Sequence, residues 1–339
     1  MKAAGFLAVL LMAPGALAQD SRDQIVSFSD NTPLAGNTEL SRRLLTPLMV
    51  VEMQKALAKS GQSLREQPLT LASEKFIVHL PPRMPANGYG LMVFVPPWKE
   101  ARLPGHWASV LDEQGMIFVS AAASGNDQYD LSRRMPLAVT AAVNIRHNYN
   151  IDPARIFMAG MSGGSRVAMR LALGYPDLFR GALLNAGSDP PGGKLASLPS
   201  RELFFKFQET SRLVYVTGEM DQANLDSDRR GIGAMHDLCM FNLDSITARG
   251  LGHETADPAS LSRALDMLQA PVKPDAGKLA ACRAGVEKDL AERLDRLEAL
   301  IGQGKKEEAR TLLVEIDQRF AGLAAPRSPE LAGRLEKAP

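Results

Sequence analysis

A serine set between glycines is the feature of this sequence best suited to chemistry. Gly160-Met161-Ser162-Gly163-Gly164 fits the pattern G-x-S-x-G, which places a serine hydroxyl on a sharp turn between a strand and a helix. The apolar residues Ile156 and Phe157 precede the pattern, and a segment of helical character follows it as far as Tyr175. A glycine-rich turn with an incidental serine is the alternative, but the flanking elements favour an activated nucleophile at Ser162.

A serine nucleophile needs a base, and the chain has five histidines. His253 lies in a glycine-flanked loop after the last predicted strand, so its imidazole can reach the serine. The other four lie in an early strand or in predicted helices: His79, His106, His147 and His236. We therefore predict that His253 is the base; a loop histidine with only local hydrogen bonds is the alternative.

The base needs a carboxylate to orient it, and this residue should follow a strand between the serine and the histidine. Asp221 follows the predicted strand 213–217 and is our predicted acid. A helix N-terminal acid that faces water is the alternative role for this residue. Four further acids in the same part of the chain compete with it: Asp189, Glu219, Asp226 and Asp228.

An oxyanion needs two N–H donors. The amide of Gly163 is one candidate, because it opens the helix behind the serine. The second should come from the loop after the predicted strand 89–95, where Pro96 and Pro97 have no N–H. Trp98 is therefore the predicted donor, with Lys99 as the neighbouring alternative. The Trp98 ring could also form the floor of an acyl pocket, or be ordinary surface cover.

Three residues are predicted to line the substrate cleft. Met161 adjoins the serine, and Asn126 and Asp127 follow the predicted strand 116–120. Together with Arg133 and Arg134, the last two could equally form a polar cluster that stabilises their loop.

The elements that must position these residues alternate between strands and helices. Strands are predicted at 89–95, 116–120, 155–159, 181–185, 213–217 and 244–248, and residues 68–80 are predicted to alternate into strands. Helices are predicted between these strands, one of them over 228–240. This alternation predicts an α/β fold with a mostly parallel sheet that is covered on both faces. Ligands of such sheets bind outside the carboxyl ends of the strands, and the candidate residues above follow strand ends.

The two ends of the chain differ from this pattern. Residues 1–18 have a lysine, an apolar stretch and Ala-Leu-Ala before Gln19, which predicts a secretory signal peptide and an exported, periplasmic or secreted protein. Residues 19–67 are predicted to form an extension with a helix, which Pro47 kinks or restarts. The catalytic domain is predicted over 68–270, and two amphipathic stripes over 275–339 predict a C-terminal helical hairpin.

Composition limits the classes of partner. Lys and Arg number 39 against 38 Asp and Glu, with no basic stripe, so a nucleic-acid binder is not indicated. Beyond the signal peptide no apolar run is long enough to span a membrane. Cys239 and Cys282 lack metal-ligand spacing, and in an exported protein we expect them to form one disulfide; two buried free thiols are the alternative.

The order Ser162, Asp221, His253 is the order found on α/β-hydrolases. The chain resembles that superfamily over about residues 68–270, and more closely exported esterases related to polyhydroxybutyrate depolymerases and to feruloyl and acetylxylan esterases. The resemblance is carried by residues 151–157 leading into the serine motif, by 218–221 and by Gly252-His253. Pro96-Pro97 departs from the His-Gly pair that many relatives have in this loop.

The resemblance implies a serine esterase that acts without a metal or organic cofactor on a small-molecule or oligomeric ester. Prolyl-oligopeptidase-type peptidases share the serine turn and the order of the triad, so a serine peptidase is the first alternative. A non-catalytic binding protein on the same fold, with the C-terminal hairpin as a protein-contact element, is the second.

Overall fold

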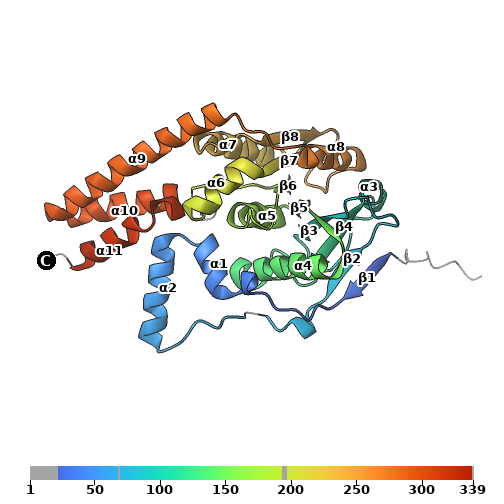
Figure 1. Ribbon diagram of the computed structural model, residues 1–339, viewed down its shortest axis with the longest axis horizontal. Helices are drawn as coiled ribbons and strands as arrows, with labels where there is room; N and C mark the ends of the chain where they lie inside the picture. The colour runs from blue at the N-terminus through green and yellow to red at the C-terminus, as the bar shows by residue number, and fades with distance from the viewer. Residues whose placement is uncertain (1–21, 68, 193–196, 338–339) are drawn as a thin grey trace, which may run out of the picture.

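An eight-stranded sheet runs through the centre of the molecule (Figure 1). The computed structural model describes residues 22–67, 69–192 and 197–337, so the predicted signal peptide lies outside the described residues. The strands follow the order β1-β2-β4-β3-β5-β6-β7-β8. Their bounds are β1 Asp23–Val26, β2 Phe76–His79, β3 Tyr89–Val95, β4 Met116–Ala121, β5 Ile151–Met161, β6 Gly181–Asn185, β7 Arg212–Gly218 and β8 Leu243–Ala248.

The sheet is parallel from β4 to β8, and β2 runs antiparallel to both of its neighbours. Alternate residues of β3 point into two different apolar clusters: Leu91 and Val93 into one, Met92 and Phe94 into the other. A strand buried on both faces needs an uninterrupted apolar sequence, which is why these strands could be predicted. The predicted mostly parallel sheet with both faces covered is confirmed, and the fold is that of an α/β-hydrolase.

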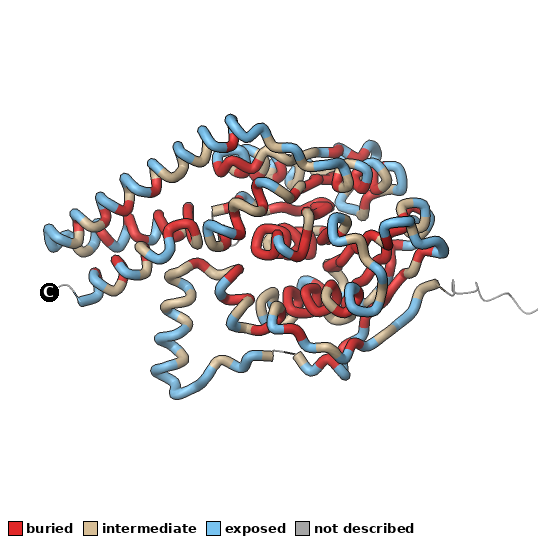
Figure 2. The backbone as a smooth tube through the Cα atoms, in the orientation of Figure 1, coloured by how far each residue is buried: buried red, intermediate tan, exposed pale blue. Residues whose placement is uncertain are grey.

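Helices cover both faces of the sheet. Leu137 of α4 and Val167 of α5 pack into the first cluster, whereas Val110 of α3 and Leu261 of α8 pack into the second. The helices between the strands are α3 Ala108–Gln114, α4 Met135–Asn148, α5 Gly163–Gly174, α6 Arg201–Thr210, α7 Gln222–Asp237 and α8 Pro258–Gln269. Figure 2 shows buried backbone concentrated in the sheet and in α4 and α5.

Two predicted boundaries need correction. The helix predicted over 228–240 begins six residues earlier, because Asp221 caps it at the end of β7. The segment 69–73, predicted to be extended, instead contains the 3-10 turn Leu71–Ser73, and the extended backbone begins at β2. The helix α6, which amphipathic spacing did not reveal, follows the loop ending at Ser200.

The N-terminal part contributes a strand as well as helices. Strand β1 lies at the edge of the sheet, so the sheet extends into the segment that the sequence assigned to an extension. The predicted single helix is divided into α1 (Asn37–Leu44) and α2 (Pro47–Ser60). Pro47 marks a second start rather than a kink, because Thr46 caps α2 by accepting from the Met49 amide.

The C-terminal part holds three helices, α9 (Ala276–Gly302), α10 (Lys306–Phe320) and α11 (Arg327–Lys337). The predicted hairpin corresponds to α9 and α10, and α11 adds a helix to it. Figure 1 shows the three gathered at the end of the molecule opposite β1. The predicted disulfide between Cys239 and Cys282 is confirmed, and it ties the end of α7 to α9. Among the described helices none combines the length and apolarity needed to cross a bilayer.

Candidate active site

The serine motif forms a sharp turn between β5 and α5. Ser162 lies between them with φ 54° and ψ −121°, a conformation that a residue with a side chain adopts only at a cost. Close backbone contacts leave no room for a side chain at two positions of the turn, which therefore require glycine. A Cβ on Gly160 would lie 2.3 Å from the Gly164 oxygen, and a Cβ on Gly164 would lie 1.9 Å from the Val95 oxygen. The turn therefore presents the hydroxyl at the carboxyl edge of the sheet, beside the end of β3.

The structure brings Ser162, His253 and Asp221 into a hydrogen-bonded chain. The His253 Nε2 lies 2.9 Å from the Ser162 Oγ, and the His253 Nδ1 lies 2.6 Å from the Asp221 Oδ2. The imidazole is about half exposed, at 47%, whereas the Asp221 side chain is only 9% exposed. A substrate can thus reach the serine and the imidazole, while the carboxylate is shielded behind them.

The Asp221 carboxylate is held by more than the imidazole. Burial raises its pKa, but hydrogen bonds from His253 and Asn224 lower it more, so the pKa lies below its usual value. The carboxylate is therefore ionised at neutral pH and accepts the Nδ1–H of His253. With that proton on Nδ1, Nε2 is left free to accept the serine proton.

Asn224 was not singled out from the sequence. Its amide nitrogen lies 3.0 Å from Oδ1 and 2.8 Å from Oδ2 of Asp221, and 3.2 Å from the His253 Nδ1. Two donors cannot bond to each other, so when His253 carries its Nδ1 proton the Asn224 amide donates to the carboxylate alone. Asn224 is thus a positioning residue for Asp221. It stands three residues later on α7, a spacing that could have suggested contact.

Asn185 is a second residue whose role was not predicted from the sequence, which indicated only that it ends a strand. It is buried at the end of β6, and its amide nitrogen donates to the Glu254 oxygen at 3.1 Å. Its side-chain oxygen accepts from the Ala256 amide at 2.7 Å, and its backbone oxygen accepts from the Ser162 amide at 2.9 Å. One side chain therefore fixes the loop that carries His253 to the strand beside Ser162.

The four competing acids each have other partners. Asp189 accepts from two arginines of α5, Asp226 from the exposed Arg229, and Glu219 from the Gly250 amide. Asp228 is buried and accepts from Ser188 and Thr217, which anchors α7 to the sheet. Burial raises the pKa of Asp228, and its two hydrogen bonds oppose that rise only in part.

The other four histidines have partners other than Ser162. His79 is buried between Asp23 and Asp112, and His147 lies beside Asp30. His106 bonds to the Ala256 oxygen, and His236 packs near Phe241.

The predicted oxyanion donors lie where β3 ends and α5 begins. Gly163 is the first residue of α5, so its N–H has no partner inside the helix. The loop after β3 is held beside it: the Pro97 oxygen accepts from the Asn126 amide, and the Lys99 oxygen accepts from the Ala123 amide. Trp98 lies between these two fixed residues, and its ring packs on Phe94.

Two clefts flank Ser162. The first, of about 490 Å³, contains Trp98, Met161 and residues of the His253 loop, and we refer to it as the loop-side cleft. The second, of about 720 Å³, contains Asn126 and Gly163 together with α5 side chains, and we refer to it as the helix-side cleft. Asp127 lines neither cleft; it is exposed and accepts from Gln128.

The two arginines near Asn126 mainly stabilise their own loop by hydrogen bonds. Arg133 donates to the Ala123 oxygen and pairs with Glu74. Arg134 donates to the oxygens of Ser124 and Pro96 and to the Asn126 side chain. Asn126 therefore takes part both in the loop-stabilising cluster and in the wall of the helix-side cleft.

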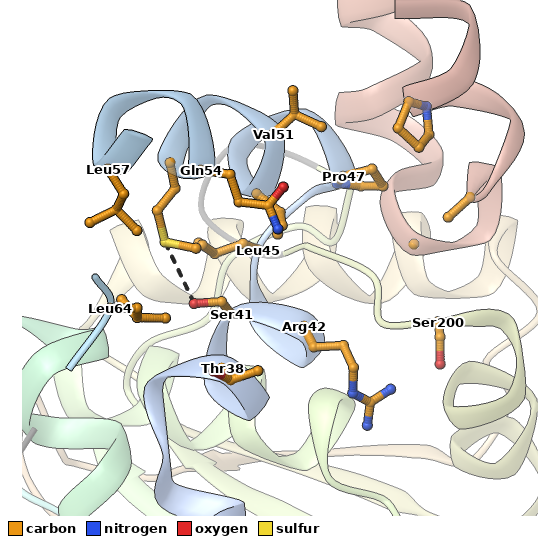
Figure 3. Close-up of a pocket in the computed structure, with 15 residues that line it drawn as sticks. Thr38, Ser41, Arg42, Leu45, Pro47, Val51, Gln54, Leu57, Leu64 and Ser200 are labelled. Carbon is orange, nitrogen blue, oxygen red and sulfur yellow. Dashed lines mark hydrogen bonds between the residues drawn. The ribbon is translucent and has the colours of Figure 1, made fainter. Parts of the chain in front are cut away.

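A third cavity lies away from the triad. It has a volume of about 620 Å³, lies between α1, α2 and the C-terminal helices, and is lined mainly by apolar side chains (Figure 3). Leu45, Val51 and Leu57 contribute to its wall, and the Ser41 hydroxyl donates to the Met53 sulfur at 3.8 Å across it. Leu45 also lines the helix-side cleft, so it separates the two spaces. Over the described ranges no cluster of three His, Cys, Asp or Glu is placed to hold a metal ion.

Comparison with known proteins gives a weak sequence match and a number of solved structures with a similar fold. No model of a known family matches the chain. A poly(3-hydroxybutyrate) depolymerase of Ralstonia pickettii is 30% identical over 107 residues, which cover 27% of this chain and 22% of the depolymerase. The match thus spans about a fifth of that protein.

Solved structures similar to this chain are esterases and peptidases of the α/β-hydrolase fold. A ferulic acid esterase shares 18% identity at a TM-score of 0.42, over 58% of this chain and 90% of that one. A puromycin-hydrolyzing peptidase of Mycobacterium tuberculosis shares 15% at a TM-score of 0.42, over 57% of this chain and 36% of that one.

Proposed function

We propose that this chain is a serine hydrolase that cleaves carboxylic esters through an acyl-enzyme, with Ser162, His253 and Asp221 as its catalytic triad. The observation that supports the proposal best is the chain of contacts from the Asp221 carboxylate through the imidazole to the Ser162 hydroxyl, at 2.6 and 2.9 Å. A nucleophile, a base and an orienting acid in this geometry are the groups that acyl transfer requires.

The proposed reaction has two halves. The Ser162 Oγ attacks the ester carbonyl while His253 Nε2 takes its proton, and the ionised Asp221 stabilises the resulting imidazolium. The oxyanion accepts hydrogen bonds from the Gly163 amide and from the amide of Trp98 or Lys99. His253 then gives the proton to the leaving alcohol. Water enters, loses a proton to His253, and attacks the acyl-enzyme to release the acid and restore the serine.

The two clefts receive opposite ends of the ester in this proposal. His253 must protonate the leaving oxygen, and Leu251, Glu254 and Thr255 of its own loop line the loop-side cleft. The alcohol part therefore belongs in the loop-side cleft. The acyl part extends the other way, past Gly163 into the helix-side cleft.

Export is part of the same proposal. The predicted signal peptide, together with the disulfide between Cys239 and Cys282, supports a periplasmic or secreted enzyme, since disulfides persist in oxidising compartments.

The test is labelling by a fluorophosphonate probe, followed by a p-nitrophenyl ester series of increasing acyl length. We expect the wild-type protein to react and Ser162→Ala to remain unlabelled, with ester turnover lost in the same variant. Folded wild-type protein that resists the probe at pH 8 would overturn the catalytic proposal and favour a binding role. Cleavage of aminoacyl amides without turnover of acyl esters would instead assign a peptidase.

A further inference from the structure

The helix-side cleft contains three arginines beside its apolar wall. Arg134, Arg166 and Arg170 line it together with Leu44, Leu45 and Met49. Such a mixture of guanidinium groups and apolar side chains is more than an acyl chain needs, because a plain hydrocarbon gains nothing from cations. The three arginines differ in how fully their donors are used.

Two of the three arginines are held by hydrogen bonds to other groups of the protein. Arg134 is buried, and its three nitrogens donate to the Ser124 oxygen, the Asp130 carboxylate and the Pro96 oxygen. Arg170 bonds through Nη1 to Asp130 at 2.7 Å and through Nη2 to Asp189 at 3.3 Å. Both side chains are thus held in place and hold the adjoining loops.

Arg166 is different. Its Nε donates to the Asp189 Oδ1 at 3.1 Å, and neither Nη nitrogen has a partner among the described residues. Its side chain is 33% exposed, so the guanidinium is fixed on one side and open on the other. The four unused N–H groups form the fork that binds a carboxylate in a bidentate manner.

The position of Arg166 places this fork along the path of the acyl group. It stands four residues after Ser162 on α5, which is a rise of about 6 Å along the helix. Gly163, the proposed oxyanion donor, lines the same cleft. A group bound by Arg166 would therefore sit several carbon atoms from the ester carbonyl.

The nearby carboxylates leave the Nη donors of Arg166 free to bind an anion. Asp130 and Asp189 are shared among the three arginines. Asp127 is exposed and close enough to act electrostatically on Arg134. These acids bring the cluster near neutrality, so the inference depends on the unused Arg166 donors and not on net charge.

We propose that the substrate is an ester whose acyl part carries a carboxylate, and that Arg166 binds this carboxylate in the helix-side cleft. The inference rests on the proposed esterase function and names its substrate class. The apolar methylenes between the two groups would lie against Leu44, Leu45 and Met49. Monoesters of dicarboxylic acids, in which several methylenes separate the two carbonyl groups, belong to this class.

The first experiment measures binding without catalysis. Ser162→Ala protein is titrated calorimetrically with monoethyl adipate and with ethyl 5-carbamoylpentanoate, the neutral amide of the same length. We expect binding of the anionic ester to be about 10-fold or more tighter, since hydrogen bonds to charged groups are the stronger ones. Adding Arg166→Gln should abolish the preference and Arg166→Lys should keep part of it. Equal binding of the two esters by Ser162→Ala overturns the inference, even if the Arg166 variants do not fold.

The second experiment measures hydrolysis of the same pair. We expect Arg166→Gln to lower kcat/KM for monoethyl adipate about 10- to 100-fold more than for the amide, mostly through KM. Arg310→Gln, an exposed arginine of α10 that pairs with Glu307, is the matched control and should leave both rates unchanged. An equal loss for both esters would make Arg166 merely structural. Selective binding without hydrolysis of either ester would refute the esterase proposal but keep the anion site.

Discussion

The carboxyl edge of the sheet and the helical end of the molecule are held together by different kinds of interaction. At the edge, short polar contacts are aimed at single atoms, and Ser162 and Ala186 take up backbone conformations with positive φ. At the helical end, leucines of α9 and α10 extend one apolar cluster of the core, and a disulfide and surface ion pairs reinforce it. Helix α2 beside them has no fully buried residue.

This difference implies a separation of effects. Loss of one polar atom at the edge should reduce activity and leave the free energy of unfolding nearly unchanged. Loss of a contact at the helical end should reduce stability and leave kcat/KM nearly unchanged. A variant of one region that produced the effect expected of the other would contradict this separation.

The largest effect is expected from Asp221→Asn. The variant keeps the shape of the side chain, but its amide no longer fixes the Nδ1–H tautomer of His253, so kcat should fall about 10³- to 10⁴-fold. Because the pKa of Asp221 lies below its usual value, the wild-type carboxylate stays ionised down to pH 5. Titration of Asp221 itself should thus add no pH dependence to the wild-type rate between pH 5 and pH 8.

Asp226→Asn is the matched control, since Asp226 is exposed on the same helix and pairs with Arg229. It should keep full activity. Comparable losses in both variants would show that α7 tolerates no charge change and would remove Asp221 from the triad.

Removal of the disulfide should give the largest effect on stability. The double variant Cys239→Ser, Cys282→Ser frees a loop of 43 residues, which should lower the free energy of unfolding by about 2–4 kcal/mol. The cysteines lie at the end of α7 and on α9, so kcat/KM should change less than about twofold in folded protein. Urea unfolding and ester turnover measure the two effects. A tenfold loss of kcat/KM at full folding would show that α9 helps to shape the site.

Asn224→Ala should have a moderate effect on activity. It removes the amide that donates to both oxygens of Asp221, so we expect kcat to fall about 10-fold with KM unchanged, while stability drops by about 1 kcal/mol at most. It should also raise the pKa of Asp221 toward its usual value. Gln222→Ala, which loses a contact to the Glu219 oxygen on the same helix, is the control. A change in KM alone would argue for contact with substrate instead of positioning.

The carboxyl edge of the sheet and the helical end also differ in how well the sequence predicted them. The strand, turn and helix around Ser162 are contiguous, and the carboxyl ends of parallel strands meet at one edge, so Asp221 and His253 could be chosen by position. Asn185 could not, because its contacts with the His253 loop join residues about 70 positions apart. Only the folded chain reveals such pairs.

The helical regions were harder to predict for another reason. Amphipathic stripes revealed α9 and α10, because their leucines face one cluster. Strand β1 was missed because it is short, lies at an edge and has no buried residue, so no apolar alternation marks it. The charged Asp317 on α10 gave no sign that it reaches α2, a contact made across 269 positions.

That contact gives the smallest predicted effect. Asp317 is 6% exposed and accepts from the Leu48 amide at 3.1 Å, and its burial raises its pKa above the usual value. A carboxyl whose pKa is raised by folding stabilises the protein less as the pH rises through that pKa. Asp317→Asn keeps an acceptor for the amide and removes the buried charge. We therefore expect it to be as stable as wild type, or more stable by up to about 1 kcal/mol, at pH 7.

The effect of Asp317→Asn on stability should depend on pH. The advantage of Asp317→Asn should shrink as the pH falls from 7 toward 4, because the wild-type carboxyl becomes protonated and loses its charge. Asp317→Leu, which leaves the Leu48 amide without its acceptor, should be less stable by about 1–3 kcal/mol at both pH values. Urea unfolding at pH 4 and pH 7 measures both variants. If Asp317→Asn were the less stable protein at pH 7, the charge itself would be holding α2 against the C-terminal helices, through the positive end of α2, where Asp317 accepts from the Leu48 amide.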